Sequence, residues 1–214
     1  EASALWRLTT ASGERFAARY IFEGVGLLSS TNLPEFPGAE TFGGEIHHAA
    51  RWPAGGVDLA GKCVAVIGTG STGIQIITEI APQVAELYVL HRTPQYVVPL
   101  GLSPFPADKR ARMDADRQGF VDWALDSASV FGLEESVTPA MSVSAEERER
   151  IYERAWRKGG GFGFMLETFG DIIVSKEANQ TATDFIRAKI RAIVKDPALA
   201  AKLSPQDLYA KRPL

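Results

Sequence analysis

The sequence has little that would support a disulfide-stabilised, membrane-spanning or nucleic-acid-binding protein. Its 214 residues contain a single cysteine, Cys63, so it can form neither an internal disulfide nor a zinc site built on several cysteines. No apolar run approaches the roughly 20 residues that a membrane-spanning helix needs. The net charge of −3 argues against a strongly basic nucleic-acid-binding protein. The low cysteine content favours a reducing, cytoplasmic compartment.

The composition is typical of a folded globular protein. Hydrophobic residues make up 45% and charged residues 23% of the chain, which argues against a disordered tail. The length allows one large domain or parts of two. The sequence begins at Glu1 and ends at Leu214 with no start or stop signal, so we interpret it as a piece of a longer protein.

Hydrophobic patterning predicts a mixed α/β chain. Residues 4–10 and 15–22 are expected to form a hairpin, followed by a connector over 29–60. From Ala107 onward the pattern becomes helical. A capping box at Ser144 predicts a helix ending near Lys158, and an apolar stripe of isoleucines predicts another over 181–195.

A glycine-rich turn lies between a predicted buried parallel strand, 63–67, and a predicted helix, 71–80, and a second strand follows at 86–90. The turn matches GxGxxG, the pattern of dinucleotide-binding folds. Gly68 permits a tight turn, Gly70 lets a pyrophosphate approach the backbone, and Gly73 lets the helix pack closely against the strand. The alternative is a glycine-rich turn without a ligand. The predicted phosphate-binding residues are Gly68, Thr69, Gly70, Ser71, Thr72 and Gly73.

The end of the second strand predicts which dinucleotide binds. An NAD site usually has an acid there for the ribose hydroxyl, but this strand ends in His91, Arg92 and Thr93. A guanidinium can bind a 2′-phosphate through two parallel hydrogen bonds, whereas a carboxylate would repel it. The sequence therefore favours NADP(H) over NAD(H). The alternative for Arg92 is a solvated residue at a strand end.

The connector holds a segment whose composition alone is ambiguous. His47 and His48 are adjacent and have no carboxylate or thiol cluster beside them, so they predict no metal site. By composition alone they are ordinary loop histidines, with Phe42 and Trp52 packing nearby. The segment nevertheless fits F-x-G-x-x-x-H-x-x-x-W-P, and this pattern resembles the fingerprint of the type I Baeyer–Villiger monooxygenases. The matching residues are Phe42, Gly44, His48, Trp52 and Pro53.

Other stretches strengthen the resemblance. Thr93-Pro94 after Arg92 is similar to the family's R-T-P turn, and Gly159–Phe164, Glu177–Asn179 and Lys211–Pro213 are similar to its cyclic-ketone branch. The resemblance implies an α/β fold that consists of a Rossmann-like NADP-binding domain, a helical subdomain inserted into it, and the tail of an FAD-binding domain. The implied boundaries are 1–50 for the FAD-domain end and connector, 51–101 for the NADP-binding βαβ unit, 102–205 for the helical insertion and 206–214 for the return.

The resemblance also implies roles for individual residues. Arg212 resembles the catalytic arginine, whose permanent positive charge would stabilise a peroxide anion attacking the ketone. Lys211 resembles a contact to the 2′-phosphate, and Gln75 a contact to the cofactor phosphates. His48 resembles the fingerprint histidine that couples the two nucleotide domains. Without the resemblance, Lys211 and Arg212 would be read as a solvated basic pair.

The implied activity is the conversion of ketones to esters or lactones by an FAD- and NADPH-dependent monooxygenase. Its partners would be a small ketone, O2 and the rest of its own FAD domain, with no nucleic acid, membrane or metal. The FAD glycine motif would lie upstream of Glu1, so the 214 residues alone are expected to be inactive. The alternatives are a flavin N- or S-oxidising monooxygenase and a non-catalytic NADP-binding module.

Overall fold

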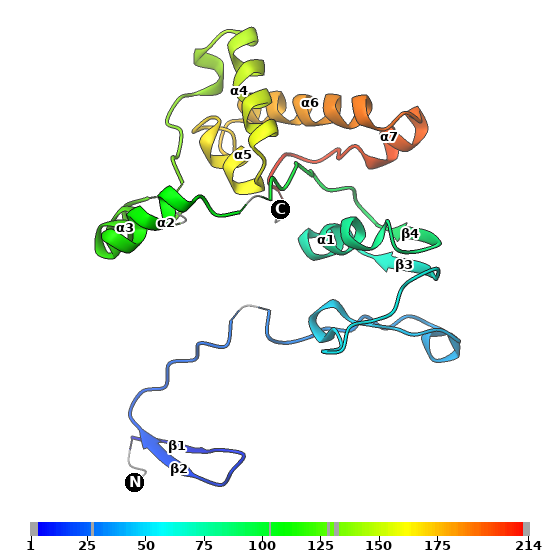
Figure 1. The fold of residues 1–214 in the computed structure, drawn as a ribbon, viewed down its shortest axis with the longest axis vertical. Helices are drawn as coiled ribbons and strands as arrows, with labels where there is room; N and C mark the ends of the chain where they lie inside the picture. Colours follow the sequence, from blue (N-terminus) through cyan, green and yellow to red (C-terminus); the bar gives the residue numbers. More distant parts are fainter. Residues whose placement is uncertain (1–3, 27, 103, 128, 131–132, 212–214) are drawn as a thin grey trace. The chain divides into compact units, whose positions relative to one another are not determined.

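The chain divides into two compact units, Glu1–Asp58 and Leu59–Leu214 (Figure 1). The computed structural model describes residues 4–26, 28–102, 104–127, 129–130 and 133–211.

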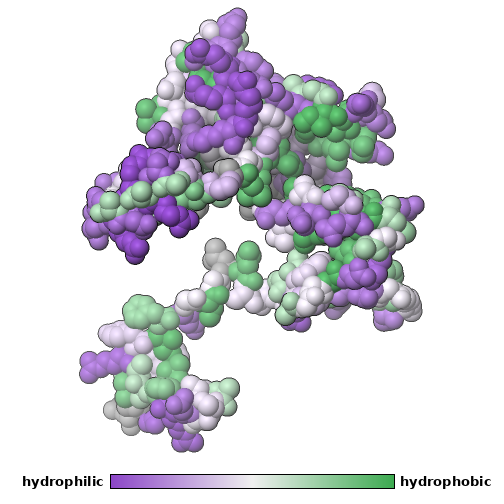
Figure 2. Space-filling model, in the orientation of Figure 1, coloured by the Kyte–Doolittle hydropathy of each residue, from purple (hydrophilic) through white to green (hydrophobic). Residues whose placement is uncertain are grey.

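The first unit contains a hairpin and two single-turn helices. Strands β1 (Trp6–Thr9) and β2 (Arg15–Ala18) are antiparallel, which confirms the predicted hairpin with shorter strands. The 3₁₀ helices η1 (Ala39–Thr41) and η2 (Ala49–Arg51) interrupt the connector. None of the unit's described residues is buried, and Figure 2 shows hydrophobic residues on the surface of the hairpin. The hairpin therefore lacks a core within its own unit.

The second unit begins with a strand–helix–strand segment. Strands β3 (Cys63–Ile67) and β4 (Glu86–Leu90) pair in parallel, and helix α1 (Ser71–Ile80) connects them. All three elements have the predicted bounds. Parallel pairing places the carboxyl ends of both strands at one edge of the sheet, where Ile67 lies opposite Leu90.

The prediction that β3 is buried is wrong. Ile67 is 64% exposed, and no residue of the strand is buried. The reason is that this parallel sheet has two strands within the described part of the chain, so its faces are only partly covered. Cys63, the first residue of this strand, is likewise exposed.

Helices form the remainder of the second unit. Ser144 is confirmed as the N-cap of a helix, because its hydroxyl accepts a hydrogen bond from the Glu147 amide at 3.2 Å. The helix predicted over 181–195 begins earlier, at Lys176, because Ser175 caps it. The elements are α2 (Ala107–Ala115), α3 (Arg117–Asp126), η3 (Ala140–Ser142), α4 (Ala145–Lys158), α5 (Gly161–Glu167), α6 (Lys176–Ile193) and α7 (Pro197–Leu203).

The hydrophobic core lies among α4, α5 and α6 rather than beside the sheet. Tyr152 of α4 stacks on Phe164 of α5, with their ring centroids 5.5 Å apart, and also contacts Phe185 of α6. Two further core residues, Tyr96 and Tyr209, lie outside the helices. The core thus joins the segment after β4 to the segment after α7.

Candidate functional site

The turn after β3 has the geometry that its glycines predict. Gly68 has a φ of 104°, a left-handed conformation that favours glycine, and its amide donates to the Leu90 carbonyl at 2.8 Å. A Cβ on Gly73 would lie 2.2 Å from the Gly68 carbonyl oxygen, closer than any side chain permits. Gly73 therefore allows the first turn of α1 to pack directly on the end of β3.

The N-terminus of α1 is suited to binding an anion. Gly70 occupies the N-cap position, and no side chain caps the helix. Space around Gly70 is open, because a Cβ there would meet nothing within 4 Å. The first amides of a helix have no intrahelical acceptor and carry the positive end of the helix dipole. Gln75 lies over this turn and donates to the Ser71 hydroxyl at 3.2 Å.

Arg92 and Thr93 leave the sheet at the same edge as the glycine turn. They follow Leu90, which accepts the hydrogen bond from Gly68, so both segments start from one point of the sheet. The Arg92 side chain is exposed and Thr93 is half-buried. The buried Nδ1 atom of His91 has no hydrogen-bond partner among the described residues. The segment that leaves this sheet edge therefore carries an exposed cation, Arg92, and a hydroxyl, Thr93.

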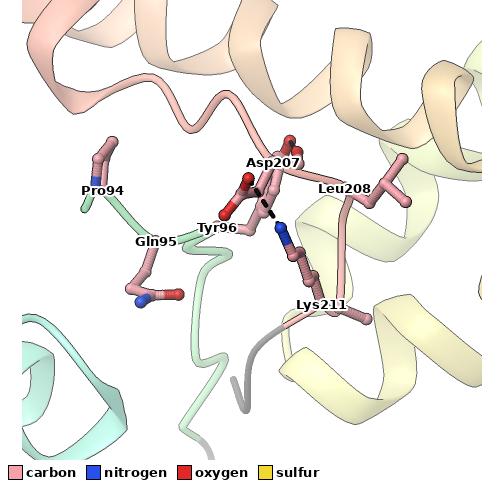
Figure 3. A pocket seen from close by; sticks show the side chains of 7 residues that line it. Pro94, Gln95, Tyr96, Asp207, Leu208 and Lys211 are labelled. Carbon is pink, nitrogen blue, oxygen red and sulfur yellow. Dashed lines mark hydrogen bonds and ion pairs between the residues drawn. The ribbon is translucent and has the colours of Figure 1, made fainter.

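The chain then brings Lys211 to the segment that follows Arg92. Figure 3 shows residues 94–96 beside residues 207–211, which we call the return segment, around a crevice of about 10 Å³. That volume is roughly the space of one water, so the crevice is no substrate cavity. The Lys211 ammonium lies 3.1 Å from a carboxylate oxygen of Asp207. Lys211 therefore forms an exposed ion pair within the return segment, which lies beside residues 94–96.

The sequence analysis assigned no site role to three residues that build this region: Tyr96, Asn179 and Asp207. Tyr96 donates to the Asp207 carbonyl at 2.5 Å, and Asn179 binds the backbone of Tyr209. One available signal was an amide on the face of α6 that otherwise carries small and apolar residues. Such a polar residue on an apolar face normally has a specific partner.

The fingerprint segment, residues 42–53, folds back on itself within the first unit. The Phe42 ring lies over Gly44, where a Cβ would lie 2.7 Å from the ring, so a larger residue there would displace the exposed Phe42 side chain. The His48 Nδ1 accepts a hydrogen bond from the Ala50 amide at 3.1 Å and caps η2, which leaves Nε2 as the protonated nitrogen. The Trp52 ring lies 6.0 Å from that of His47, and Pro53 follows it.

The remaining predictions about the site concern Arg212 and metals. Arg212 lies outside the described residues. No group of three or more histidine, cysteine or acidic residues within the described ranges could hold a metal ion. Among the same residues, no helix has both the length and the apolar character needed to cross a membrane.

The chain is similar to curated enzymes along its whole length. It is 52% identical to a cyclohexanone 1,2-monooxygenase of an Acinetobacter species and 50% identical to a Baeyer–Villiger monooxygenase of Pseudooceanicola batsensis. Each match covers 100% of this chain and 39% of the relative. A phenazine N-monooxygenase of Lysobacter antibioticus is 48% identical over 98% of the chain and 39% of that relative. The chain therefore spans about two fifths of the length of these relatives. No protein-family model matches it.

Solved structures give the same picture. A cyclohexanone monooxygenase from Rhodococcus sp. Phi1 bound to NADP+ matches with a TM-score of 0.90 and 53% identity, over 99% of this chain and 40% of that one. A second structure, OTEMO in complex with FAD and NADP, matches with a TM-score of 0.86 and 36% identity, over 97% of this chain and 40% of that one. The mixed α/β fold is therefore that of these monooxygenase structures.

Proposed function

Because this chain belongs to the Baeyer–Villiger monooxygenases along its whole length, we propose that it forms the NADP-binding part of a flavin-dependent monooxygenase. The whole enzyme would convert ketones to esters or lactones with NADPH and O2. The observation that carries this proposal is the contact between Gly68 and Gly73 at the uncapped N-terminus of α1. This contact supports the proposal that β3, α1 and β4 are part of a Rossmann-like dinucleotide-binding domain.

The residues present fit NADP. The open amides at the start of α1, over Gly68–Gly73, would bind the pyrophosphate, with Gln75 as a neighbouring donor. Arg92 and Lys211 would bind the 2′-phosphate from two sides, Arg92 as a planar fork and Lys211 as a point charge. Thr93 adds a hydroxyl at the same sheet edge. The exposure of both cations fits a ligand that approaches from solvent.

The residues of this chain would bind and orient rather than exchange electrons. FAD, reduced by NADPH, would supply the site at which O2 is activated. Arg212 would hold a permanent positive charge beside the reacting oxygen, since a guanidinium stays protonated at any working pH. His48 and the fingerprint segment would couple the NADP-binding and FAD-binding domains. In this proposal the exposed apolar hairpin, with Trp6 62% and Phe16 55% exposed, packs against the rest of the FAD domain.

The domain boundaries follow the same proposal. Residues 1–50 would end the first FAD-domain segment, 51–101 would form the NADP-binding unit, 102–205 the helical insertion, and 206–214 the return into the NADP domain. A cytoplasmic location rests on the low cysteine content and stays a prediction.

A second candidate is oxidation of a nitrogen heterocycle. It is favoured by the 48% identity to a phenazine N-monooxygenase. Both reactions would use the same NADP-binding residues, so the described site does not distinguish between them. The choice depends on the shape of the substrate pocket.

The test is a product assay on the full-length enzyme loaded with FAD. With NADPH and O2, we expect cyclohexanone to yield its lactone with one NADPH oxidised per product. Phenazine is the competing substrate, and formation of its N-oxide without any lactone would favour the second candidate. A protein that binds NADPH but forms neither an N-oxide nor an ester or lactone, from cyclohexanone or from a panel of linear and cyclic ketones, would be a binding module, and the proposed activity would be wrong.

A further inference from the structure

The return segment has a backbone conformation that its sequence does not favour. Ala210 has a φ of 57°, in the left-handed region where the alanine Cβ crowds the neighbouring carbonyl. The turn is closed by a hydrogen bond from the Lys211 amide to the Leu208 carbonyl at 3.2 Å. A non-glycine residue keeps such a conformation when its surroundings impose it. The contacts of this segment should therefore reveal what holds it.

Asn179 binds both backbone groups of the residue before Ala210. Its Nδ2 donates to the Tyr209 carbonyl at 3.0 Å, and its Oδ1 accepts from the Tyr209 amide at 2.9 Å. Nδ2 also donates to the Ile172 carbonyl at 2.9 Å, and the Thr183 hydroxyl lies 3.5 Å from Oδ1. The side chain is 4% exposed, so water does not compete for these bonds. One buried amide thus fixes the orientation of the Tyr209 peptide groups.

Tyr96 holds the start of the same segment. Its hydroxyl donates to the Asp207 carbonyl, and its ring meets the ring of Tyr209 edge to face at a centroid distance of 5.5 Å. Tyr96 lies four residues after Arg92, on the segment that leaves β4. The return segment is therefore tied to α6 on one side and to the chain carrying Arg92 on the other.

The chemistry of Asn179 argues against simple packing. Its neighbours on the buried face of α6 include Ala178, Ala182 and Ile186. A buried amide is unfavourable unless its hydrogen bonds are made, so an apolar residue would serve packing as well or better. What an apolar residue lacks is a donor and an acceptor that together match the carbonyl and the amide of Tyr209.

We propose that Asn179 is a positioning residue for the cofactor: by fixing the backbone of Tyr209 it holds the return segment in its left-handed turn and so places the Lys211 ammonium. This inference rests on the proposed NADP site, in which Lys211 binds the 2′-phosphate. Because NADH lacks that phosphate, replacing Asn179 should weaken the binding of NADPH and leave the binding of NADH nearly unchanged.

The experiment measures the dissociation constants of NADPH and NADH by fluorescence titration of the full-length, FAD-loaded protein. The flavin is first reduced with dithionite and O2 is excluded, so that neither cofactor is consumed. Lys211→Ala is the reference, expected to lower the preference for NADPH about tenfold, as for one charge-assisted hydrogen bond. Asn179→Ala should lower it by a similar factor, and the double variant N179A/K211A should be no worse than Lys211→Ala alone. Such non-additivity is expected only when Asn179 acts through Lys211.

A rescue variant separates positioning from packing. Ala210→Gly removes the conformational penalty of the left-handed turn, since glycine adopts it readily. In the Asn179→Ala background it should restore part of the NADPH preference, which a repaired core would not explain. As a readout without cofactor, hydrogen exchange of the Tyr209 amide should be faster in Asn179→Ala.

Each result has a definite meaning. If Lys211→Ala leaves the preference for NADPH unchanged, the proposed 2′-phosphate contact is wrong. If Lys211→Ala lowers it while Asn179→Ala does not, the positioning role is wrong. If Asn179→Ala does not fold, Tyr96→Phe takes its place, because it removes one hydroxyl and keeps the ring. That variant should lower the preference two- to fivefold, and an unchanged preference would overturn the inference.

Discussion

Replacing Gly73 with alanine should separate the helix from the strand on which it packs. The new Cβ would lie 2.2 Å from the Gly68 carbonyl oxygen, whereas ordinary contacts begin at 3.4 Å. The first turn of α1 must therefore move by roughly 1 Å, and overpacking of this kind costs up to about 3 kcal/mol. The higher helix propensity of alanine relative to glycine offsets about 1 kcal/mol of this loss. We expect a net loss of about 2 kcal/mol in the free energy of unfolding.

Gly70→Ala is the matched control, because it adds the same methyl group three residues away. Gly70 has a φ of −71°, which alanine adopts without strain, and open space surrounds it. Stability should change by less than about 1 kcal/mol. In the proposed site, however, the methyl group would stand where the pyrophosphate approaches, so NADPH binding should weaken at least about tenfold.

The assay pairs thermal unfolding with NADPH titration of the full-length protein. Gly73→Ala should lower the melting temperature by several degrees, at about 2–4 °C per kcal/mol for a domain of this size. Gly70→Ala should leave the melting temperature nearly unchanged and lose binding. The reasoning is refuted if Gly73→Ala melts at the wild-type temperature, or if Gly70→Ala binds NADPH as tightly as the wild type.

Three further predictions address charge and burial. Arg92→Ala should weaken NADPH binding about 10- to 100-fold and NADH binding little, measured by titration, since charge-assisted hydrogen bonds contribute about 1.5–3 kcal/mol each; equal losses would exclude the 2′-phosphate contact. Asp207→Asn releases Lys211 from its exposed ion pair, so NADPH should bind up to about fivefold more tightly at low salt, with the gain fading at high salt. Burial raises the pKa of Tyr152 to about 12 and also raises that of Tyr209. Unfolded tyrosines ionise near pH 10, so the free energy of unfolding should fall as pH rises above about 10, and urea titrations that show no such fall would contradict this.

Local structure at the glycine turn could be predicted from sequence because short-range rules decide it. The β-branched run after Lys62, the glycines and the apolar helix pattern fixed the bounds of β3, α1 and β4 to the residue. The hydrogen bond at Ser144 follows from the same kind of local pattern. The contact between Gly68 and Gly73 spans five residues, and the hydrogen bond between Ser144 and Glu147 spans three.

The parts that were missed depend on partners far apart in the chain. Asn179 and Tyr209 are separated by 30 residues, and Tyr96 and Asp207 by 111, so no local pattern reports their contact. The exposure of Ile67 was missed for a related reason. A β-branched run predicts a strand, but its burial depends on how many strands and helices surround it.

The absence of buried residues from the described part of the first unit has a consequence for the order of folding. An isolated two-stranded hairpin is marginally stable in water, because it gains too little from burying apolar surface. The helical core around Tyr152, in contrast, is assembled largely from contacts within the second unit. That core can therefore form early and serve as the nucleus. The hairpin with Trp6 and Phe16 would become ordered late, once a complementary surface is in place. Substitutions in the hairpin should thus speed unfolding and leave the refolding rate nearly unchanged.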